Sequence, residues 1–116
     1  MNSARPSRGE IWLVNLNPTR GHEQAGIRPC LIVSADMFNH GPAGLVTVIP
    51  LTTRRKKIRS HVEIRPPEAG VREVSFAKTE DIRSIDKQRL MERWGVVSRR
   101  TMQQVEDLVK VLLDLP

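Results

Sequence analysis

Short apolar stretches alternate with polar breaks containing glycine and proline along most of this chain. Runs of this length, rich in β-branched residues and bounded by such breaks, are typical of strands. The pattern predicts strands over residues 10–16, 30–35, 45–49, 61–64, 74–77 and 94–97, the third of them closed by Pro50. No helical segment between these strands is long enough for parallel crossovers. We therefore expect a mainly antiparallel sheet that curls into a small barrel.

The last part of the chain has a helical period instead. Ser98 is suited to cap a helix, because its hydroxyl can accept a hydrogen bond from a backbone amide of the first turn. Apolar residues then recur at helical spacing: Met102, Val105, Leu108, Val109 and Leu112. This predicts a C-terminal α-helix whose apolar face packs on the barrel rather than on a partner. One further helical turn is expected over residues 87–91.

The length of 116 residues corresponds to one domain. We expect a loose tail over residues 1–8 and a single domain over residues 9–116. A signal peptide has an apolar run after its charged residues, and this tail has none. No apolar stretch of the sequence is long enough to span a membrane. The lack of both features predicts a cytoplasmic protein. The strand and helix patterns described above predict the mainly β class with a C-terminal α-helix.

The net charge of +6 is concentrated in one place. Five basic residues lie within six positions: Arg54, Arg55, Lys56, Lys57 and Arg59. A basic patch on an otherwise near-neutral body suits a polyanion or an acidic protein partner, although such runs are also common in plain solvated loops. Aromatic residues make up only 3% of the chain, which argues against a surface that binds single strands mainly by base stacking.

The residues that most often bind metals are few and scattered. Cys30 is the one cysteine and lies in an apolar run, so we expect a small buried side chain rather than a disulfide or a reactive thiol. The histidines, His22, His40 and His61, are far apart in the sequence. We therefore expect neither a metal site nor a cofactor.

Arg28 is the first candidate for chemistry. It ends a polar stretch in which Gly21 and Gly26 permit unusual backbone conformations. Pro29 favours an extended conformation at Arg28, so this side chain leaves the chain at a defined place between a loop and a strand. A guanidinium there could bind a phosphate with two hydrogen bonds. An ion pair with a nearby carboxylate is the alternative that the local sequence leaves open.

The second candidate is the end of the third strand. Thr52 and Thr53 follow Pro50 and Leu51 directly and precede the basic run. Threonines at a strand end are usually ordinary strand formers. Next to a phosphate-binding patch, however, their hydroxyls are candidate donors to a phosphoryl oxygen.

Three segments in this order and spacing resemble the MazF/PemK family of toxins. They are Gly-His-Glu-Gln-Ala-Gly-Ile-Arg-Pro at 21–29, Ile-Pro-Leu-Thr-Thr at 49–53 and Asp-Ile-Arg-Ser-Ile-Asp-Lys-Gln-Arg-Leu at 81–90. The opening residues 8–12 and a turn containing Gly95 before the last helix are also similar. The resemblance covers residues 8–115, and its most specific part is the first segment.

The resemblance implies an SH3-like barrel that forms a homodimer and acts as a sequence-specific endoribonuclease on single-stranded RNA. It also implies a cognate antitoxin that neutralises the toxin and binds DNA together with it. The family's catalytic arginine and threonine fall on Arg28 and Thr52. Glu23 and Gln24 match loop residues near the scissile phosphate. Glu80 and Asp81 fall where the family can contact bases, and Asp81 stands where some members have glutamine, so base preference does not carry over.

The reaction implied is attack by a ribose 2′-hydroxyl on the neighbouring phosphate without a metal, giving a 2′,3′-cyclic phosphate and a 5′-hydroxyl. Because guanidinium stays protonated at any working pH, we expect Arg28 to hold the developing negative charge, with Thr52 as a second donor. Glu23 is then the candidate to accept the 2′-hydroxyl proton. A pair formed by His22 and His61, working as in two-histidine ribonucleases, is the alternative enzyme.

Two other classes of protein share this expected barrel. One is a gyrase poison of the CcdB type, which relies on a C-terminal tail; here residues 113–116 contain no tryptophan. The other is an SH3-like module that binds RNA or protein without catalysis. The segments around Arg28 and Thr52 favour the nuclease. Its antitoxin is expected to be acidic and partly disordered, because the predicted groove is basic.

Overall fold

A computed structural model gives the structure of this protein, and it describes residues 5–116. The strands are β1 (Glu10–Asn15), β2 (Ile27–Ile32), β3 (Leu45–Thr52), β4 (His61–Ile64), β5 (Ser75–Lys78), β6 (Arg83–Asp86) and β7 (Leu90–Val96). The helices are α1 (Asp36–Asn39) and α2 (Arg99–Leu112), with short 3-10 turns η1 (Glu68–Gly70), η2 (Thr79–Asp81) and η3 (Lys87–Arg89).

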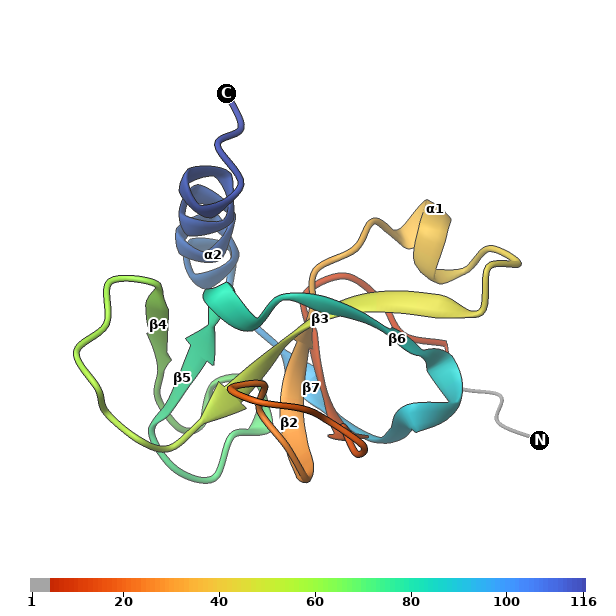
Figure 1. Ribbon diagram of the computed structural model, residues 1–116, viewed down its shortest axis with the longest axis horizontal. Coiled ribbons are helices and arrows are strands. Elements are labelled where there is room, and N and C mark those ends of the chain that lie inside the picture. The colour runs from red at the N-terminus through yellow and green to blue at the C-terminus, as the bar shows by residue number, and fades with distance from the viewer. Residues whose placement is uncertain (1–4) are drawn as a thin grey trace.

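The strands form one antiparallel sheet in the order β4-β5-β3-β2-β1-β7, and β6 pairs with β3 beside this path. The sheet curls strongly, with α2 standing beside β4 and β5 (Figure 1). It stays open between β4 and β7, which lie at its two ends. The predicted class, a mainly β barrel-like sheet with a C-terminal helix, is confirmed.

The two faces of the sheet carry separate apolar cores. One core contains Ile11, Leu31 and Ile49, and α2 packs on it through Val105. The other contains buried side chains from the alternate positions of the same strands: Trp12, Val14, Leu16, Cys30, Ile32, Val46, Val48, Ile85 and Leu90. Because side chains alternate along a strand, a functional residue within a strand can be assigned to one of these two faces from its register.

The C-terminal helix follows the predicted pattern. The Ser98 hydroxyl accepts a hydrogen bond from the backbone N–H of Thr101 at 3.1 Å, as expected for the cap. Met102, Leu108 and Val109 pack against the first core together with Val105. Leu112, at the end of the predicted stripe, is 42% exposed and lies beyond the sheet. The helix therefore uses its apolar face for the barrel, as predicted.

The predicted end of the third strand at Pro50 is wrong. The strand β3 continues through Pro50 to Thr52 and changes its partner on the way. Up to Pro50 it pairs with β2, and from Leu51 it pairs with β5. Proline has no N–H to donate to a ladder. The break in hydrogen bonding that the sequence indicated is therefore real, but it marks a change of partner rather than the end of the strand.

Other strand boundaries also differ from the prediction. Residues 83–86 form β6, a strand that the sequence analysis missed. The last strand is longer than predicted, since β7 begins at Leu90, and the turn expected at 87–91 is confined to η3. Gly95 lies within β7 rather than in a turn. A Cβ atom at Gly95 would come within 2.7 Å of the Ala69 carbonyl carbon, so this strand passes η1 where a side chain has no room.

Residues 1–4 of the predicted loose tail lie outside the described residues. Within its described part, the Ser7 N–H donates to Glu10 at 2.7 Å and the Arg8 N–H donates to Asp36 at 2.7 Å. The Arg8 guanidinium also forms an ion pair with Glu106 of α2 at 2.7 Å. No helix in residues 5–116 has the length and apolar character needed to cross a membrane.

Candidate active site

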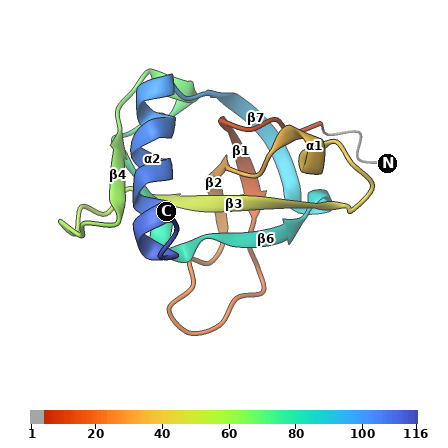
Figure 2. The ribbon, with the colours of Figure 1, turned by 90° about the horizontal axis from the view of Figure 1, so that it is seen from above.

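The strand register brings Arg28 and Thr52 to equivalent positions on neighbouring strands. The pairing of β2 with β3 ends at Cys30 and Pro50, and Arg28 and Thr52 each lie two residues beyond this last pair. Arg28 lies two residues from Cys30 and Thr52 lies four residues from Val48, and both of these reference residues belong to the second core. Because side chains alternate along a strand, Arg28 and Thr52 lie on the face of that core, away from α2. The loop of residues 16–26, which joins β1 to β2, projects from the sheet next to this place (Figure 2).

Arg28 is half-buried and makes little use of its guanidinium within the chain. Its Nε donates to the carbonyl of Ala25 at 3.1 Å, which ties the side chain to the end of the loop. It forms no ion pair with any carboxylate in residues 5–116. The ion-pair alternative for Arg28 therefore has no support, and the four N–H groups on its two terminal nitrogens are free to bind an anion.

Thr52 is 7% exposed. Its Oγ1 accepts a hydrogen bond from the backbone N–H of Arg54 at 3.2 Å. A hydroxyl that accepts in this way still has its own proton to donate. Because the side chain belongs to the same face as Arg28, that donor is available where the guanidinium lies. Thr53, the next residue, follows the end of β3 and is exposed.

Glu23 lies in the projecting loop and is held there by two contacts. Its carboxylate accepts from the backbone N–H of Arg20 at 3.1 Å and lies 3.4 Å from Nη1 of Arg83. The guanidinium of Arg83 in β6 also donates to the carbonyl of Leu16 at 3.3 Å, at the start of the loop. Arg83 thus contacts both the start of the loop and Glu23 within it.

Gln24, the next loop residue, is bonded to the barrel at both its backbone and its side chain. Its N–H donates to the Asp81 carboxylate at 2.7 Å, and its side-chain oxygen accepts from Nζ of Lys78 at 3.1 Å. Asp81 and Lys78 are supplied by η2 and by the end of β5. The predicted residues Glu23, Gln24 and Asp81 are therefore brought together.

Glu80 is fixed by hydrogen bonds to both of its oxygens. It accepts from the Ser60 hydroxyl at 2.8 Å and from Nε2 of His61 at 2.9 Å. Partial burial raises the pKa of Glu80, but these hydrogen bonds outweigh burial and hold the pKa below its usual value. Glu80 is therefore a rigid, ionised acceptor at neutral pH, a property suited to the N–H edges of bases.

Glu23, Glu80 and Asp81 line a cavity of about 410 Å³. Its walls are formed by the projecting loop, the segment between β3 and β4, and the elements β4, β5 and η2. The lining residues are His22, Glu23, Lys56, Ile58, His61, Lys78, Glu80 and Asp81. The two histidines of the alternative mechanism thus lie on one cavity. The His61 side chain, however, is only 3% exposed and its Nε2 is bonded to Glu80, whereas Arg28 has free donors. The geometry favours Arg28 as the group that meets the phosphate.

The basic segment between β3 and β4 does not act as one uniform patch. Arg55 lies over the ring of Phe76, with its Cζ 4.9 Å from the ring centre, and pairs with Glu63 at 3.0 Å. This arginine is therefore largely committed to the barrel surface. The other four basic side chains form no ion pair within residues 5–116 and are exposed: Arg54, Lys56, Lys57 and Arg59.

Cys30 is buried, as predicted, and burial raises the pKa of its thiol. It is therefore a packed side chain rather than a nucleophile. Residues 5–116 contain no group of three or more His, Cys, Asp or Glu side chains arranged to hold a metal ion.

Two charged residues of the site were not recognised from the sequence. Lys78 shares its face of β5 with Phe76, and Arg83 shares its face of β6 with Ile85. The alternation of Ser75 to Lys78 contained a usable signal for Lys78, because one face of that strand carries Phe76 and Lys78. For Arg83 there was none, since the strand β6 itself was missed.

Known proteins are similar to this chain in both sequence and structure. Residues 7–113 match the family model described as PemK-like, MazF-like toxin of type II toxin-antitoxin system. Endoribonuclease MazF of Staphylococcus saprophyticus is 35% identical over 109 residues, which cover 93% of this chain and 91% of that protein.

Solved structures agree with the sequence comparison. MazF from Deinococcus radiodurans superposes with a TM-score of 0.87 at 28% identity, covering 97% of this chain and 100% of that one. A mycobacterial endoribonuclease in complex with its cognate antitoxin gives a TM-score of 0.79 at 26% identity, covering 96% and 97%. The match extends over nearly the whole chain in each comparison. The chain therefore belongs to the PemK-like, MazF-like toxin family of type II toxin-antitoxin systems.

Proposed function

We propose that this protein is an endoribonuclease toxin that cuts single-stranded RNA, including mRNA, at the site formed by Arg28 and Thr52. The activity is that named for its relative from Staphylococcus saprophyticus. The observation that carries the assignment of the site is the half-buried guanidinium of Arg28, which has no carboxylate partner in residues 5–116 and shares its sheet face with the buried Thr52 hydroxyl. Cleavage is specific for a short RNA sequence and takes place in the cytoplasm, where mRNA is found.

The chemistry proposed is attack by the ribose 2′-hydroxyl on its own phosphate. A bond forms between the 2′-oxygen and phosphorus, and the bond to the 5′-oxygen of the next nucleotide breaks. The products are a 2′,3′-cyclic phosphate and a 5′-hydroxyl. Arg28 and the Thr52 hydroxyl donate hydrogen bonds to the non-bridging oxygens, whose negative charge grows as the pentavalent state forms. No metal ion takes part.

Glu23 is our candidate for accepting the proton of the 2′-hydroxyl. In this structure Arg83 and the Arg20 N–H hold its carboxylate, which orients it and keeps it available as an acceptor. Arg28 is not assigned this proton, because a guanidinium does not deprotonate in the working pH range. The departing 5′-oxygen takes up a proton and leaves as the 5′-hydroxyl.

The partners proposed are RNA, a second copy of the chain and an antitoxin. The mycobacterial relative is described in complex with its cognate antitoxin. In the present chain the net charge of +6 and the exposed basic segment favour an acidic antitoxin segment that folds on binding and covers the RNA site. With the antitoxin bound, the complex binds DNA.

The direct test is cleavage of single-stranded RNA by the purified protein in excess EDTA. We expect cutting to continue and sequencing of the ends to show 2′,3′-cyclic phosphates and a shared sequence around the cut. Arg28→Ala is expected to lower the single-turnover rate by about 10²–10³-fold. Its circular dichroism spectrum should stay unchanged, because the Arg28 side chain makes a single hydrogen bond within residues 5–116.

The matched control is Arg99→Ala, which removes the same type of side chain from the exposed start of α2. It should cut at the rate of the unaltered protein. A requirement for metal would contradict the proposal, and so would full activity in the Arg28 variant. Binding of RNA without cleavage would favour a non-catalytic module, and inhibition of gyrase with intact RNA would favour a gyrase poison.

A further inference from the structure

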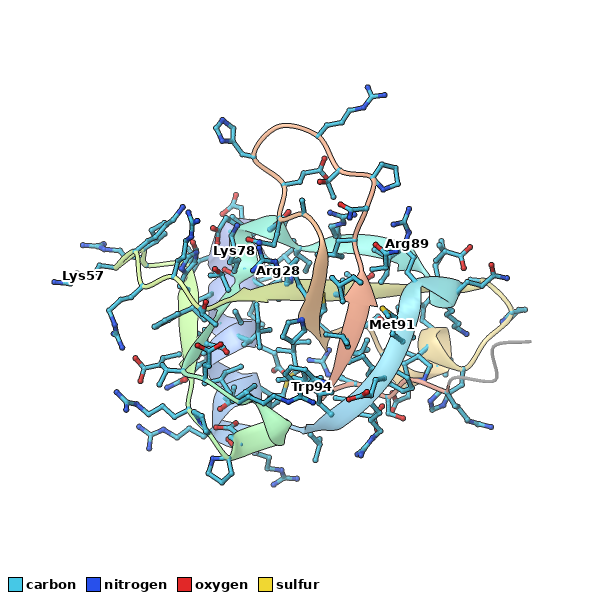
Figure 3. The ribbon with its side chains drawn as sticks, turned by 90° about the horizontal axis from the view of Figure 1, so that it is seen from below. Arg28, Lys57, Lys78, Arg89, Met91 and Trp94 are labelled. Carbon is cyan, nitrogen blue, oxygen red and sulfur yellow. The ribbon has the colours of Figure 1, made fainter. Side chains whose placement is uncertain are left out.

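Lys78 is a charged residue of the cavity that the proposed reaction does not use. It ends β5, where it pairs with His61 of β4 on one side. On the other side, the register of β5 with β3 places it opposite Pro50. It therefore belongs to the same sheet face as Thr52 and Arg28, two strand spacings, or roughly 10 Å, from the strand of Arg28. In Figure 3 Lys78 and Arg28 both lie near the base of the projecting loop.

The Lys78 ammonium group has donors to spare. It is half-buried and donates to the side-chain oxygen of Gln24 at 3.1 Å. An ammonium has three N–H groups, so two are left without a partner in residues 5–116. Lys78 forms no ion pair with a carboxylate there. A half-buried cation without a counter-ion, open to a cavity, favours binding of an anion.

Three carboxylates line the same cavity, and each is already engaged. Glu23 is bonded by Arg20 and paired with Arg83, and Glu80 is bonded by Ser60 and His61. The third carboxylate, that of Asp81, accepts a hydrogen bond from the N–H of Gln24. The two lysines of this cavity, the half-buried Lys78 and the exposed Lys56, therefore form no ion pair with its carboxylates in residues 5–116.

We propose that the Lys78 ammonium group binds a phosphate of the RNA strand next to the phosphate that Arg28 and Thr52 hold. The inference rests on the proposed function for the identity of the anion. Gln24 orients the ammonium, and the strand runs from Arg28 across β3 to the cavity. A phosphate contact of this kind is independent of sequence and is made equally before and during the reaction. Lys78 is thus a binding residue, distinct from the groups that stabilise the transition state.

The test measures binding of a 2′-O-methyl RNA 12-mer of random sequence, which cannot be cleaved, as a function of salt concentration. For a single strand, each phosphate contact adds about 0.7 to the slope of log K against log salt. Lys78→Gln should lower the slope by about 0.7 and weaken binding about tenfold at low salt. Lys78→Arg should restore both values. The control Lys110→Gln removes one positive charge from α2, which packs on the other face, and should change neither.

Cleavage kinetics separate binding from chemistry. In Lys78→Gln we expect KM to rise while kcat stays within about twofold, because a contact common to ground and transition states affects KM alone. Equal losses in kcat and kcat/KM would overturn the proposal. So would an unchanged salt slope, or a Gln24→Ala variant that reproduces every effect of Lys78→Gln, since Lys78 would then act only by holding the loop.

A measurement on the unaltered protein covers the case in which the variants do not fold. Reductive methylation followed by mass spectrometry should show Lys78 protected by the bound 12-mer and Lys110 unprotected. Equal modification of Lys78 with and without the 12-mer would contradict the proposal. If the protein cuts no RNA at all, the proposed function fails. If it cuts RNA and Lys78 behaves like Lys110, the function stands and this inference alone is wrong.

Discussion

The surroundings of the Thr52 hydroxyl determine where its proton can go. The Thr52 hydroxyl oxygen accepts a hydrogen bond from the N–H of Arg54, and the side chain is buried at the end of β3. Thr52→Val keeps the shape and removes the hydroxyl. We expect the single-turnover cleavage rate to fall about 10²–10³-fold, since one donor to the developing charge is lost. Stability should fall by about 1 kcal/mol because the Arg54 N–H loses its acceptor.

Thr52→Ser is the matched control for this prediction. It keeps the hydroxyl and loses only a methyl group, so most of the cleavage activity should return. The rates are measured with enzyme in excess over RNA, and stability is measured by urea denaturation. If the valine variant cuts at the normal rate, the hydroxyl has no part in the reaction and the threonine is only a strand residue.

At the scale of elements, Glu10 connects three segments of the chain. Its carboxylate accepts from the Ser7 N–H at 2.7 Å, from the Trp12 indole at 3.0 Å and from Arg93 of β7 at 2.6 Å. Burial raises the pKa of Glu10, but the hydrogen bonds from these donors outweigh burial, so the pKa lies below its ordinary value of 4.5. The folded protein therefore binds this proton less readily than the unfolded chain.

The lowered pKa of Glu10 predicts the direction of a pH effect on stability. Its contribution is fully present above pH 4.5 and is lost as the pH falls through the lower pKa of the folded state. Glu10→Gln should destabilise the protein by about 2 kcal/mol at pH 7, and the difference should shrink below about pH 4.5. Urea denaturation at several pH values measures this. The control is Glu92→Gln. Glu92 forms an exposed ion pair with Arg72 at 3.7 Å, so its loss should change the free energy of unfolding only slightly. If the difference in free energy of unfolding between Glu10→Gln and the unaltered protein does not vary with pH, the role given to Glu10 is contradicted.

The element scale also shows what the sequence could predict and what it could not. The C-terminal helix was predictable because its period and its Ser98 cap are local features. The strand β6 was not, because Arg83, Ser84 and Asp86 surround the single apolar Ile85, and only pairing with β3 makes them extended. Lys78 was missed for a related reason. The alternation of Ser75 to Lys78 indicated its face of the strand, but its contact with Gln24 and its place on the cavity depend on which segments lie beside β5.

The site shows the same division between local and tertiary information. Arg28 and Thr52 were singled out from their own segments, yet their position on one face of the sheet depends on the register of β2 and β3. The contacts of Glu23 with Arg83 and of Gln24 with Lys78 join residues more than 50 positions apart in the chain. Pairing between such distant groups follows from the fold and cannot be derived from the residues alone.

At the scale of the whole molecule, the positive charge is concentrated on the segment between β3 and β4. Four of its basic side chains are exposed and unpaired within residues 5–116, whereas Arg55 is held by Glu63 and Phe76. Figure 3 shows Lys57 at the outer edge of this segment, far out from the sheet. The free charges can follow an RNA strand leaving the cavity, but Arg55 can do so only by giving up its contacts.

Changing the four free residues to glutamine therefore tests the basic segment as an RNA track. With about 0.7 per phosphate contact, the salt slope of binding to the random 2′-O-methyl 12-mer should fall by up to about 2.8. The four positions are Arg54, Lys56, Lys57 and Arg59. Arg55→Gln should leave the slope unchanged and lower the thermal midpoint slightly, because it removes a contact within the barrel. If instead the fourfold variant keeps the full slope, these charges are only a solvated loop, and the RNA strand leaves the cavity by another path.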